Sequence, residues 1–405
     1  MTESRRLVER VARESYGRLL AILVSSTRDL SSAEDVLAEA FAEALTRWPH
    51  TGAPSNPEAW LVTVARRRQT DGLRRKYTSL AAERHLRLLA EEAAAAAEET
   101  SDWPDRRLAL MFACAAPGID TAMHAPLILQ TLLGLTADQI GAAYLVPSRV
   151  MGQRLVRAKA RIKEAGRAFA APDKQDVPSR LPAILDALYA AFTCSWAGND
   201  GGGLAQEAIW LAELLVRLLP DQPEAKGLLS LMLYVQARSD ARRQDGAYVP
   251  LQEQEPTTWD ERAIATAEAM LNAANESGPS GRYQIEAAIQ SAHCARRLTE
   301  RVDWVSIAAL YDLLHALVPT PIVDLNRAVA YRHTQGASAA LEMIRSLDAH
   351  KSMLSYQPFW AARAQLAAES EAFEEAQHAY TLAIGLSTDP AVRSFLANQR
   401  AALPL

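Results

Sequence analysis

The sequence is poor in aromatic residues and has few runs of β-branched residues. Aromatic side chains make up 6% of its 405 residues, while Ala and Leu dominate an apolar content of 49%. Ala and Leu favour helices, and the apolar residues recur at helical spacing. The composition therefore predicts an all-α protein.

Cysteine is also scarce. Cys114, Cys194 and Cys294 lie far apart and form no C-x-x-C pair. This spacing disfavours a zinc site or a disulfide framework, and free cysteines are usually buried. We expect three buried thiols, no metal and no cofactor.

Long apolar runs are missing. No stretch approaches the roughly 20 apolar residues of a membrane span, and the N-terminus, MTESRRLVER, lacks the apolar core of a signal peptide. We expect a cytoplasmic protein without membrane contact. No Ser/His/Asp, Cys/His or paired-carboxylate arrangement stands out, so we also expect no enzymatic activity.

The net charge of −5 is distributed unevenly. Residues 1–172 carry 24 Lys and Arg against 20 Asp and Glu, whereas residues 173–405 carry 19 against 28. Residues 1–172 contain two clusters of basic residues, Arg66–Lys76 and Arg149–Lys163. The Arg149–Lys163 cluster contains no acidic residue. Such clusters suit contact with phosphates.

Helical periodicity and its interruptions divide the chain into four segments. Residues 1–80 are predicted to form a unit of three helices. Ser31 or Ser32 is the expected N-cap of the second, and the third runs from about Pro57 to Tyr77. Residues 81–102 are an Ala/Glu-rich linker, residues 103–170 a second helical unit, and residues 178–405 a series of helix pairs. Small residues along those pairs favour stacked helices.

Residues 134–166 predict a helix-turn-helix. Thr136 is the expected N-cap of the first helix, Pro147 interrupts the chain, and Ser148 is the expected N-cap of the second. Gly141 and Ala142 are small enough for a close helix crossing. The residues expected to face inward are Ile140, Ala143, Val150, Met151, Leu155, Ala158 and Ile162.

The opposite face of the second helix carries Arg149, Gln153, Arg154 and Arg157. These side chains are of the types that reach base edges and flanking phosphates. The alternative interpretation is an amphipathic helix whose basic face is solvated.

Two motifs in a fixed order give these observations a family context. The segments SSAEDVLAEAF and SNPEAWL, followed by ARRRQTDGLRRK, resemble region 2 of bacterial sigma factors of the extracytoplasmic-function (ECF) class, and residues 134–166 resemble their region 4. The resemblance implies that region 2 binds the β′ coiled coil of core RNA polymerase and melts the −10 promoter element. It further implies that region 4 contacts the β flap and reads the −35 element.

The resemblance also implies roles for individual residues. Asp35 and Glu39 are expected to face the polymerase, although Ala38 replaces the usual Gln between them. The residues expected to contact DNA are Asn56, Trp60, Arg66, Arg67, Arg74, Arg75, Ser148, Arg149, Gln153, Arg154, Arg157 and Lys159.

The C-terminal segment resembles the tetratricopeptide (TPR)-like extension of one ECF subgroup. The chain reads Phe192 to Trp196 where that subgroup has F-N-E-G-Y. The resemblance implies an intramolecular contact through which the extension regulates the sigma domains. A helical adaptor protein and a small-molecule sensor remain alternatives.

Overall fold

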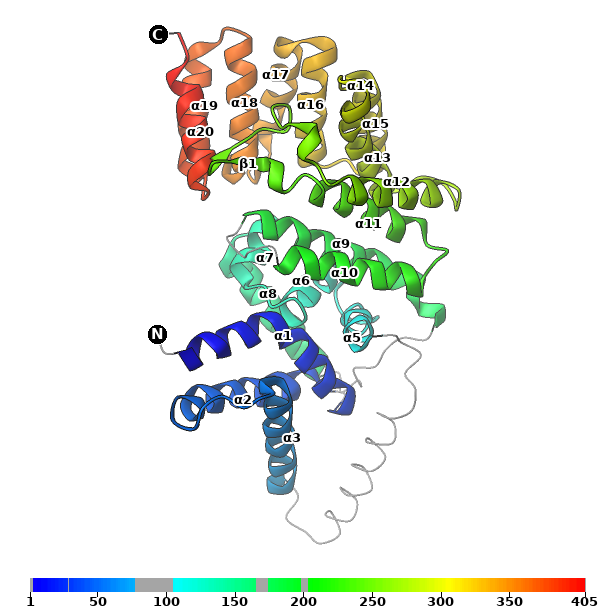
Figure 1. Cartoon of the computed structure of the whole chain (residues 1–405), viewed down its shortest axis with the longest axis vertical. Coiled ribbons are helices and arrows are strands. Elements are labelled where there is room, and N and C mark those ends of the chain that lie inside the picture. The colour runs from blue at the N-terminus through cyan, green and yellow to red at the C-terminus, as the bar shows by residue number, and fades with distance from the viewer. Residues whose placement is uncertain (1–2, 28, 77–104, 165–173, 198–202, 405) are drawn as a thin grey trace. The chain divides into compact units, whose positions relative to one another are not determined.

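A computed structural model describes residues 3–27, 29–76, 105–164, 174–197 and 203–404 (Figure 1). The predicted linker at 81–102 lies outside the described residues. The described residues are helical almost throughout, which confirms the all-α prediction, and the chain forms two compact units, residues 1–214 and 215–405. None of the described helices combines the length and hydropathy that a membrane crossing needs.

The first unit begins with three helices that pack on one another: α1 (Glu3–Thr27), α2 (Leu30–Thr51) and α3 (Pro57–Lys76). Leu20, Leu37 and Leu61 are fully buried between them. The carboxylate of Asp29 accepts the Ser32 N–H and caps α2. The predicted Ser31 and Ser32 caps are therefore wrong, because the cap lies two residues before Ser31 and both serines lie inside the helix.

The α-helices described next are α5 (Arg106–Cys114), α6 (Thr121–Thr131), α7 (Ala137–Ala143), α8 (Ser148–Glu164), α9 (Val177–Ala197) and α10 (Gly203–Leu218). The helix α6 is central, because it contacts α5, α7, α8 and α9. Its buried side chains include Leu127, Ile128 and Leu129.

The helix α9 belongs to the first unit rather than to the helix pairs that follow. It packs on α6, and the nearly buried guanidinium of Arg180 donates to the Phe112 carbonyl at 3.0 Å. The helix begins at Val177 with Pro178 in its first turn, where a missing N–H costs nothing. The boundary between the compact units thus lies later than residue 178. The charged, Pro-bearing stretch before α9 marks a break in the chain, but it does not indicate which core the next helix joins.

The second unit consists of packed helices and one short antiparallel strand pair. Its α-helices are α11 (Pro223–Gln236), α12 (Glu261–Asn275), α13 (Arg282–Cys294), α14 (Arg296–Thr299), α15 (Trp304–Leu317), α16 (Pro321–Gln335), α17 (Ala337–Ser346), α18 (Gln357–Glu369), α19 (Phe373–Leu386) and α20 (Pro390–Ala401). The strands β1 (Arg243–Gln244) and β2 (Ala247–Tyr248) pair antiparallel, with Arg243 opposite Tyr248.

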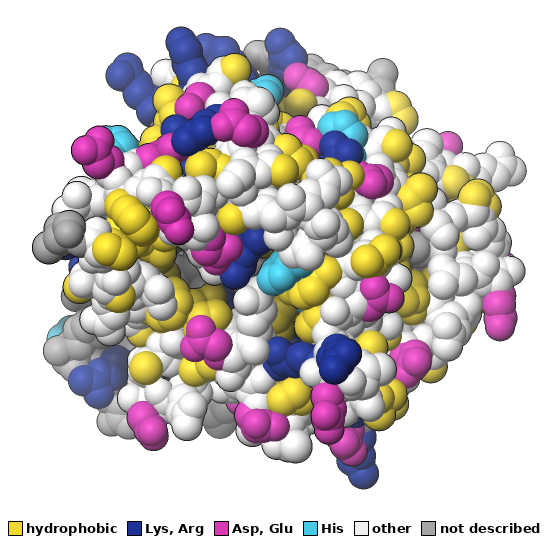
Figure 2. All heavy atoms as spheres, turned by 90° about the horizontal axis from the view of Figure 1, so that it is seen from above, with side chains coloured by type: hydrophobic (Ala, Val, Ile, Leu, Met, Phe, Trp, Pro, Cys, Tyr) yellow, Lys and Arg dark blue, Asp and Glu magenta, His cyan; other side chains and the backbone are white. Residues whose placement is uncertain are grey.

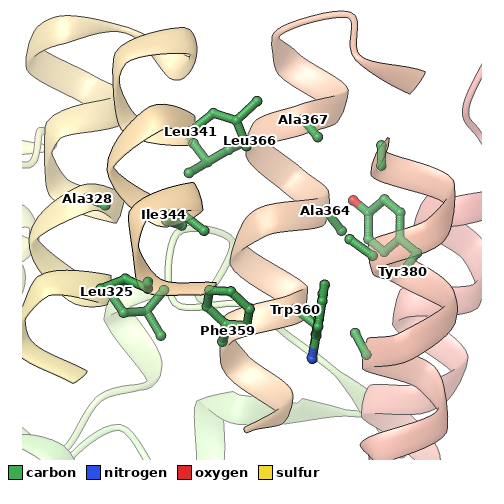
Figure 3. Close-up of a cluster of buried hydrophobic side chains, with 14 of the residues drawn as sticks. Leu325, Ala328, Leu341, Ile344, Phe359, Trp360, Ala364, Leu366, Ala367 and Tyr380 are labelled. Atoms are coloured by element: carbon green, nitrogen blue, oxygen red, sulfur yellow. The ribbon is translucent and has the colours of Figure 1, made fainter. Parts of the chain in front are cut away.

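A continuous apolar core runs through α16 to α19 (Figure 3). Phe359 is fully buried and meets the Trp360 ring edge to face at 5.0 Å, while Ala364, Ala376 and Ala383 let the helices approach closely. Large residues packed against alanines give the dense interior on which this part of the unit depends.

Truncation of Phe359 tests the importance of this core. We expect Phe359→Ala to lower the free energy of unfolding by about 3 to 5 kcal/mol, because it removes a buried ring and leaves a cavity. Urea unfolding followed by tryptophan fluorescence measures the change. The control is Leu298→Ala, since Leu298 is 79% exposed and an exposed truncation changes stability by less than about 0.5 kcal/mol. Equal effects of the two substitutions would contradict the assigned core.

Candidate nucleic-acid interface

A reciprocal capping arrangement starts the first helix of the predicted helix-turn-helix. The Thr136 hydroxyl accepts the Gln139 N–H at 3.3 Å, and the Gln139 side chain accepts the Thr136 N–H at 2.9 Å. Both bonds satisfy backbone donors that an α-helix leaves without partners. The predicted cap at Thr136 is confirmed.

The turn between the helices spans Tyr144 to Pro147. Leu145 has a φ of 53°, and the Val146 N–H donates to the Gly141 carbonyl at 2.8 Å. The Pro147 carbonyl accepts the N–H groups of Val150 and Met151. Pro147 therefore occupies the cap position and Ser148 is the first residue of α8, so the predicted Ser148 cap is wrong.

The helices α7 and α8 come so close at the turn that only glycine fits at position 141. A Cβ atom at Gly141 would lie 2.6 Å from the Val146 carbonyl oxygen and 3.3 Å from the Ser148 Cα. The crossing therefore depends on the absence of a side chain there.

One apolar stripe anchors α8. Met151, Leu155 and Ala158 are buried as predicted, and so is Ile140 on α7. Ala143 and Val150 are exposed, which contradicts the prediction for both. Successive helical residues are rotated by roughly 100°, and each of these two points well away from the centre of its buried stripe.

The predicted DNA-reading residues lie on the exposed side of α8. Arg149, Gln153, Arg154 and Arg157 are all exposed. Within the described part of the chain, no ion-pair partner is found for these three arginines. Arg161, absent from the predicted set, is exposed on the same helix and continues the basic surface. Arg161 belongs to the same acid-free stretch, and this charge pattern in the sequence could have added it to the predicted DNA-binding residues.

Lys159 differs from the other basic residues of α8. Its ammonium group donates to the Glu34 carboxylate on α2 at 2.7 Å, and both side chains are largely buried. Sequence alone missed this pair because the two residues are 125 positions apart. Lys159 thus contacts protein in this structure, and its predicted role at DNA stays untested.

A second close contact joins the first three helices to the α5–α8 segment. Gly17 on α1 approaches Leu132 after α6 so closely that an added Cβ would overlap the Leu132 carbonyl.

Cys114 is fully buried, and burial raises the pKa of its thiol to about 12. Cys294 is also buried as expected, whereas Cys194 is only half-buried.

On α3, the predicted promoter contacts have mixed environments. The Asn56 side chain accepts the Ala59 N–H at 3.0 Å and caps the helix, and Trp60 lies half-buried against Trp48 at 5.4 Å. Arg66 and Arg67 are exposed. Arg74 and Arg75 belong to α3, but their side chains lie outside the described residues.

The predicted polymerase-facing acids lie on the exposed side of α2. Asp35 is exposed, and Glu39 pairs with Arg68 at 2.9 Å. Arg68 also contacts Glu43 at 2.8 Å and lowers the pKa of that carboxyl group. Surface pairs of this kind contribute less than about 1 kcal/mol, so a binding partner can displace them at little cost.

No arrangement in the described residues suggests metal chemistry. Among the described His, Cys, Asp and Glu side chains, no group of three or more is placed to hold a metal ion.

The glycines at positions 141 and 152 form a matched pair for a test of the turn. We expect Gly141→Ala to destabilise the first unit by about 1 to 3 kcal/mol, because the added methyl overlaps backbone. Gly152→Ala should be neutral or stabilising, since its methyl would lie 3.7 Å from the Ala137 Cβ and alanine favours helices. Thermal unfolding measures both variants. If Gly141→Ala is as stable as Gly152→Ala, the close crossing is incorrect.

Two protein-family models match parts of the chain. A model described as Sigma-70 region 2 matches residues 6–78, and a family of unknown function, DUF6596, matches residues 180–275. No solved structure matches the chain.

Two relatives extend this result. An uncharacterized protein of Rhizobium meliloti (strain 1021), R00370, is 35% identical over 390 residues, which cover 94% of this chain and 92% of the relative. The probable RNA polymerase sigma factor RfaY of Xanthomonas campestris pv. campestris is 26% identical over 162 residues, which cover 37% of this chain and 40% of the relative. The chain therefore belongs to the same protein family as R00370, and with a Sigma-70 region 2 domain formed by its first three helices it is a sigma-70 family factor.

Proposed function

We propose that the chain is a sigma factor of the ECF class that directs core RNA polymerase to promoters through −10 and −35 recognition. The observation that carries the proposal is that a Sigma-70 region 2 domain is followed in the sequence by α8, whose exposed face is basic and free of acids. Neither feature alone specifies promoter recognition, since basic helix-turn-helices occur in many DNA-binding proteins.

The helix α8 acts as the reader of the −35 element. Its N-terminal half carries Arg149, Gln153, Arg154 and Arg157 on one exposed side, and the major groove accepts a helix in this orientation. Arginine hydrogen-bonds guanine and phosphate, and glutamine hydrogen-bonds adenine. These side chains therefore supply both sequence readout and electrostatic attachment.

The first three helices bind the polymerase and the −10 element. Asp35 and Glu39 on α2 face the β′ coiled coil. Asn56, which caps α3, and the α3 residues Trp60, Arg66 and Arg67 lie toward the promoter. The Arg68 pairs with Glu39 and Glu43 are exposed, so they exchange for polymerase contacts without loss of a buried interaction.

The C-terminal segment regulates the sigma domains, and α9 provides the physical connection. The match to DUF6596 begins at residue 180, on a helix that packs against α6 and α7 in the first unit. The Cys194 thiol lies 3.9 Å from the Gln139 carbonyl, next to the capped start of α7. A shift of α9 would therefore act on the helix-turn-helix directly. The proposal includes a TPR-like second unit, and the succession of helix pairs supports this part of it. The acidic charge of residues 173–405 supports a contact with the basic sigma domains.

In vitro transcription tests the proposed activity. Purified full-length protein with core polymerase is expected to start transcripts at discrete sites that share −35 and −10 elements. Core polymerase alone is the control. If neither the full-length protein nor a form limited to the first unit, residues 1–214, directs initiation at specific sites, the proposal fails and a helical adaptor protein becomes the better interpretation.

Removal of two α8 arginines tests the assigned reader. We expect Arg154→Ala with Arg157→Ala to weaken promoter DNA binding by about 10- to 1000-fold and to reduce the slope of log affinity against log salt by about 1 per lost phosphate contact. Fluorescence anisotropy over a salt series measures both effects.

The matched control is Arg262→Ala with Arg301→Ala, because both are exposed arginines of the second unit and their loss changes the net charge equally. The affinity and salt slope of this control should equal those of the unmodified protein. Equal losses in the control and the α8 variant would show that net charge, rather than the α8 surface, governs binding.

A further inference from the structure

A buried arginine without a carboxylate partner lies at the end of α11 in the second unit. Arg238 is 6% exposed, and within the described residues no Asp or Glu pairs with it. Burial lowers its pKa, and the nearby charges of Arg242 and Arg296 lower it further. A charge buried without an opposite charge destabilises a fold by several kcal/mol, so this site calls for compensation.

The hydrogen bonds of Arg238 leave one nitrogen unpartnered. Its Nε donates to the Tyr234 carbonyl at 3.2 Å, and Nη2 donates to the Gln290 side-chain oxygen. Nη1 is buried and has no partner in the described protein. The two partners are neutral, so they satisfy donors without balancing the charge.

Trp259 brings a second guanidinium to the same place. The Cζ atoms of Arg238 and Arg296 lie 5.8 Å and 5.2 Å from the centre of the Trp259 ring. Trp259 is 3% exposed, and its indole N–H has no partner in the described residues. Arg296 donates from Nη1 and Nη2 to the carbonyls of Gln252 and Gln254, and its buried Nε is likewise unpartnered.

The histidine next to this cluster does not supply the missing negative charge. Burial, followed by the charges of Arg238 and Arg296, lowers the pKa of His293 to about 3. The imidazole is therefore neutral at pH 7, and it packs edge to face on Trp304 at 5.4 Å. The net charge of the cluster comes from the guanidiniums and is positive.

We propose that Arg238, Arg296 and Trp259 form a binding site for a small oxyanion, either a phosphate or a carboxylate. The three unpartnered donors are Arg238 Nη1, Arg296 Nε and Trp259 Nε1, and both guanidiniums lie near the Trp259 ring. Guanidinium and indole N–H groups form short, strong hydrogen bonds to the ionised oxygens of a carboxylate or phosphate. A bound oxyanion would satisfy these donors and balance the buried charge.

The burial of the donors selects a free small molecule over the surface of another macromolecule. All three nitrogens are enclosed, and the segment ending at Gln254 lies against Arg296 through its carbonyls. The face shown in Figure 2 carries acidic and basic side chains interspersed with hydrophobic ones. The site supplies a specific location for the small-molecule sensing considered above as an alternative role of this segment.

Isothermal titration calorimetry on the full-length protein tests the site. Inorganic phosphate and succinate are titrated separately, with sodium chloride at matched ionic strength as the control. We expect saturable binding of at least one oxyanion, a rise in melting temperature with its concentration, and no such response to chloride. A stronger response to phosphate or to succinate identifies which oxygen chemistry the site prefers.

Variants connect the binding to the cluster. Arg238→Gln and Trp259→Phe should each weaken the oxyanion at least about tenfold, the loss expected for one charge-assisted hydrogen bond, while Arg262→Gln should bind normally. Far-UV circular dichroism verifies folding, and if Arg238→Gln does not fold, Trp259→Phe carries the test because it keeps an aromatic ring in place. The proposal is overturned if neither oxyanion binds beyond the chloride control, or if the folded cluster variants bind as tightly as Arg262→Gln.

Discussion

The burial of one apolar stripe on α8 determines which way every charged residue of that helix faces. Met151, Leu155 and Ala158 are held against the core, and the close crossing at Gly141 fixes the angle at which α7 meets α8. Once those contacts are set, Arg149, Gln153, Arg154 and Arg157 can only point outward. The basic surface is thus a consequence of packing, and its charge needs no compensation because water solvates it.

The helices around α8 depend on the same packing. The helix α6 contacts α8 on one side and α9 on another, so the first helix of the C-terminal segment shares a core with the helix-turn-helix. The Lys159–Glu34 pair and the Gly17–Leu132 contact connect this core to the first three helices. The helices that the proposal assigns to polymerase binding and DNA binding therefore pack together with α9 within one compact unit.

Local chemistry in the sequence predicted much of this arrangement. The Thr136 cap, the stripe of Met151, Leu155 and Ala158, and the all-α fold follow from hydrogen-bonding preferences and helical periodicity. The features that sequence did not reveal depend on distant partners. The exposure of Ala143 and Val150 depends on which side of each helix its neighbours cover, and the local sequence does not give this. Likewise, no pattern in residues 171–180 indicates that α9 joins the first unit. The local sequence around Arg238 does not indicate its burial, because Trp259 and Gln290, which contact it, lie on other segments.

Site-specific crosslinking measures the central claim most directly, because it reports where α8 lies on the promoter. A photo-crosslinking residue at Gln153, in a complex with core polymerase and promoter DNA, should crosslink to the −35 element. The same residue at Arg262 should give no DNA crosslink. Crosslinking from position 153 that is absent, or spread evenly along the DNA, would contradict the assignment of α8 as the promoter-reading helix.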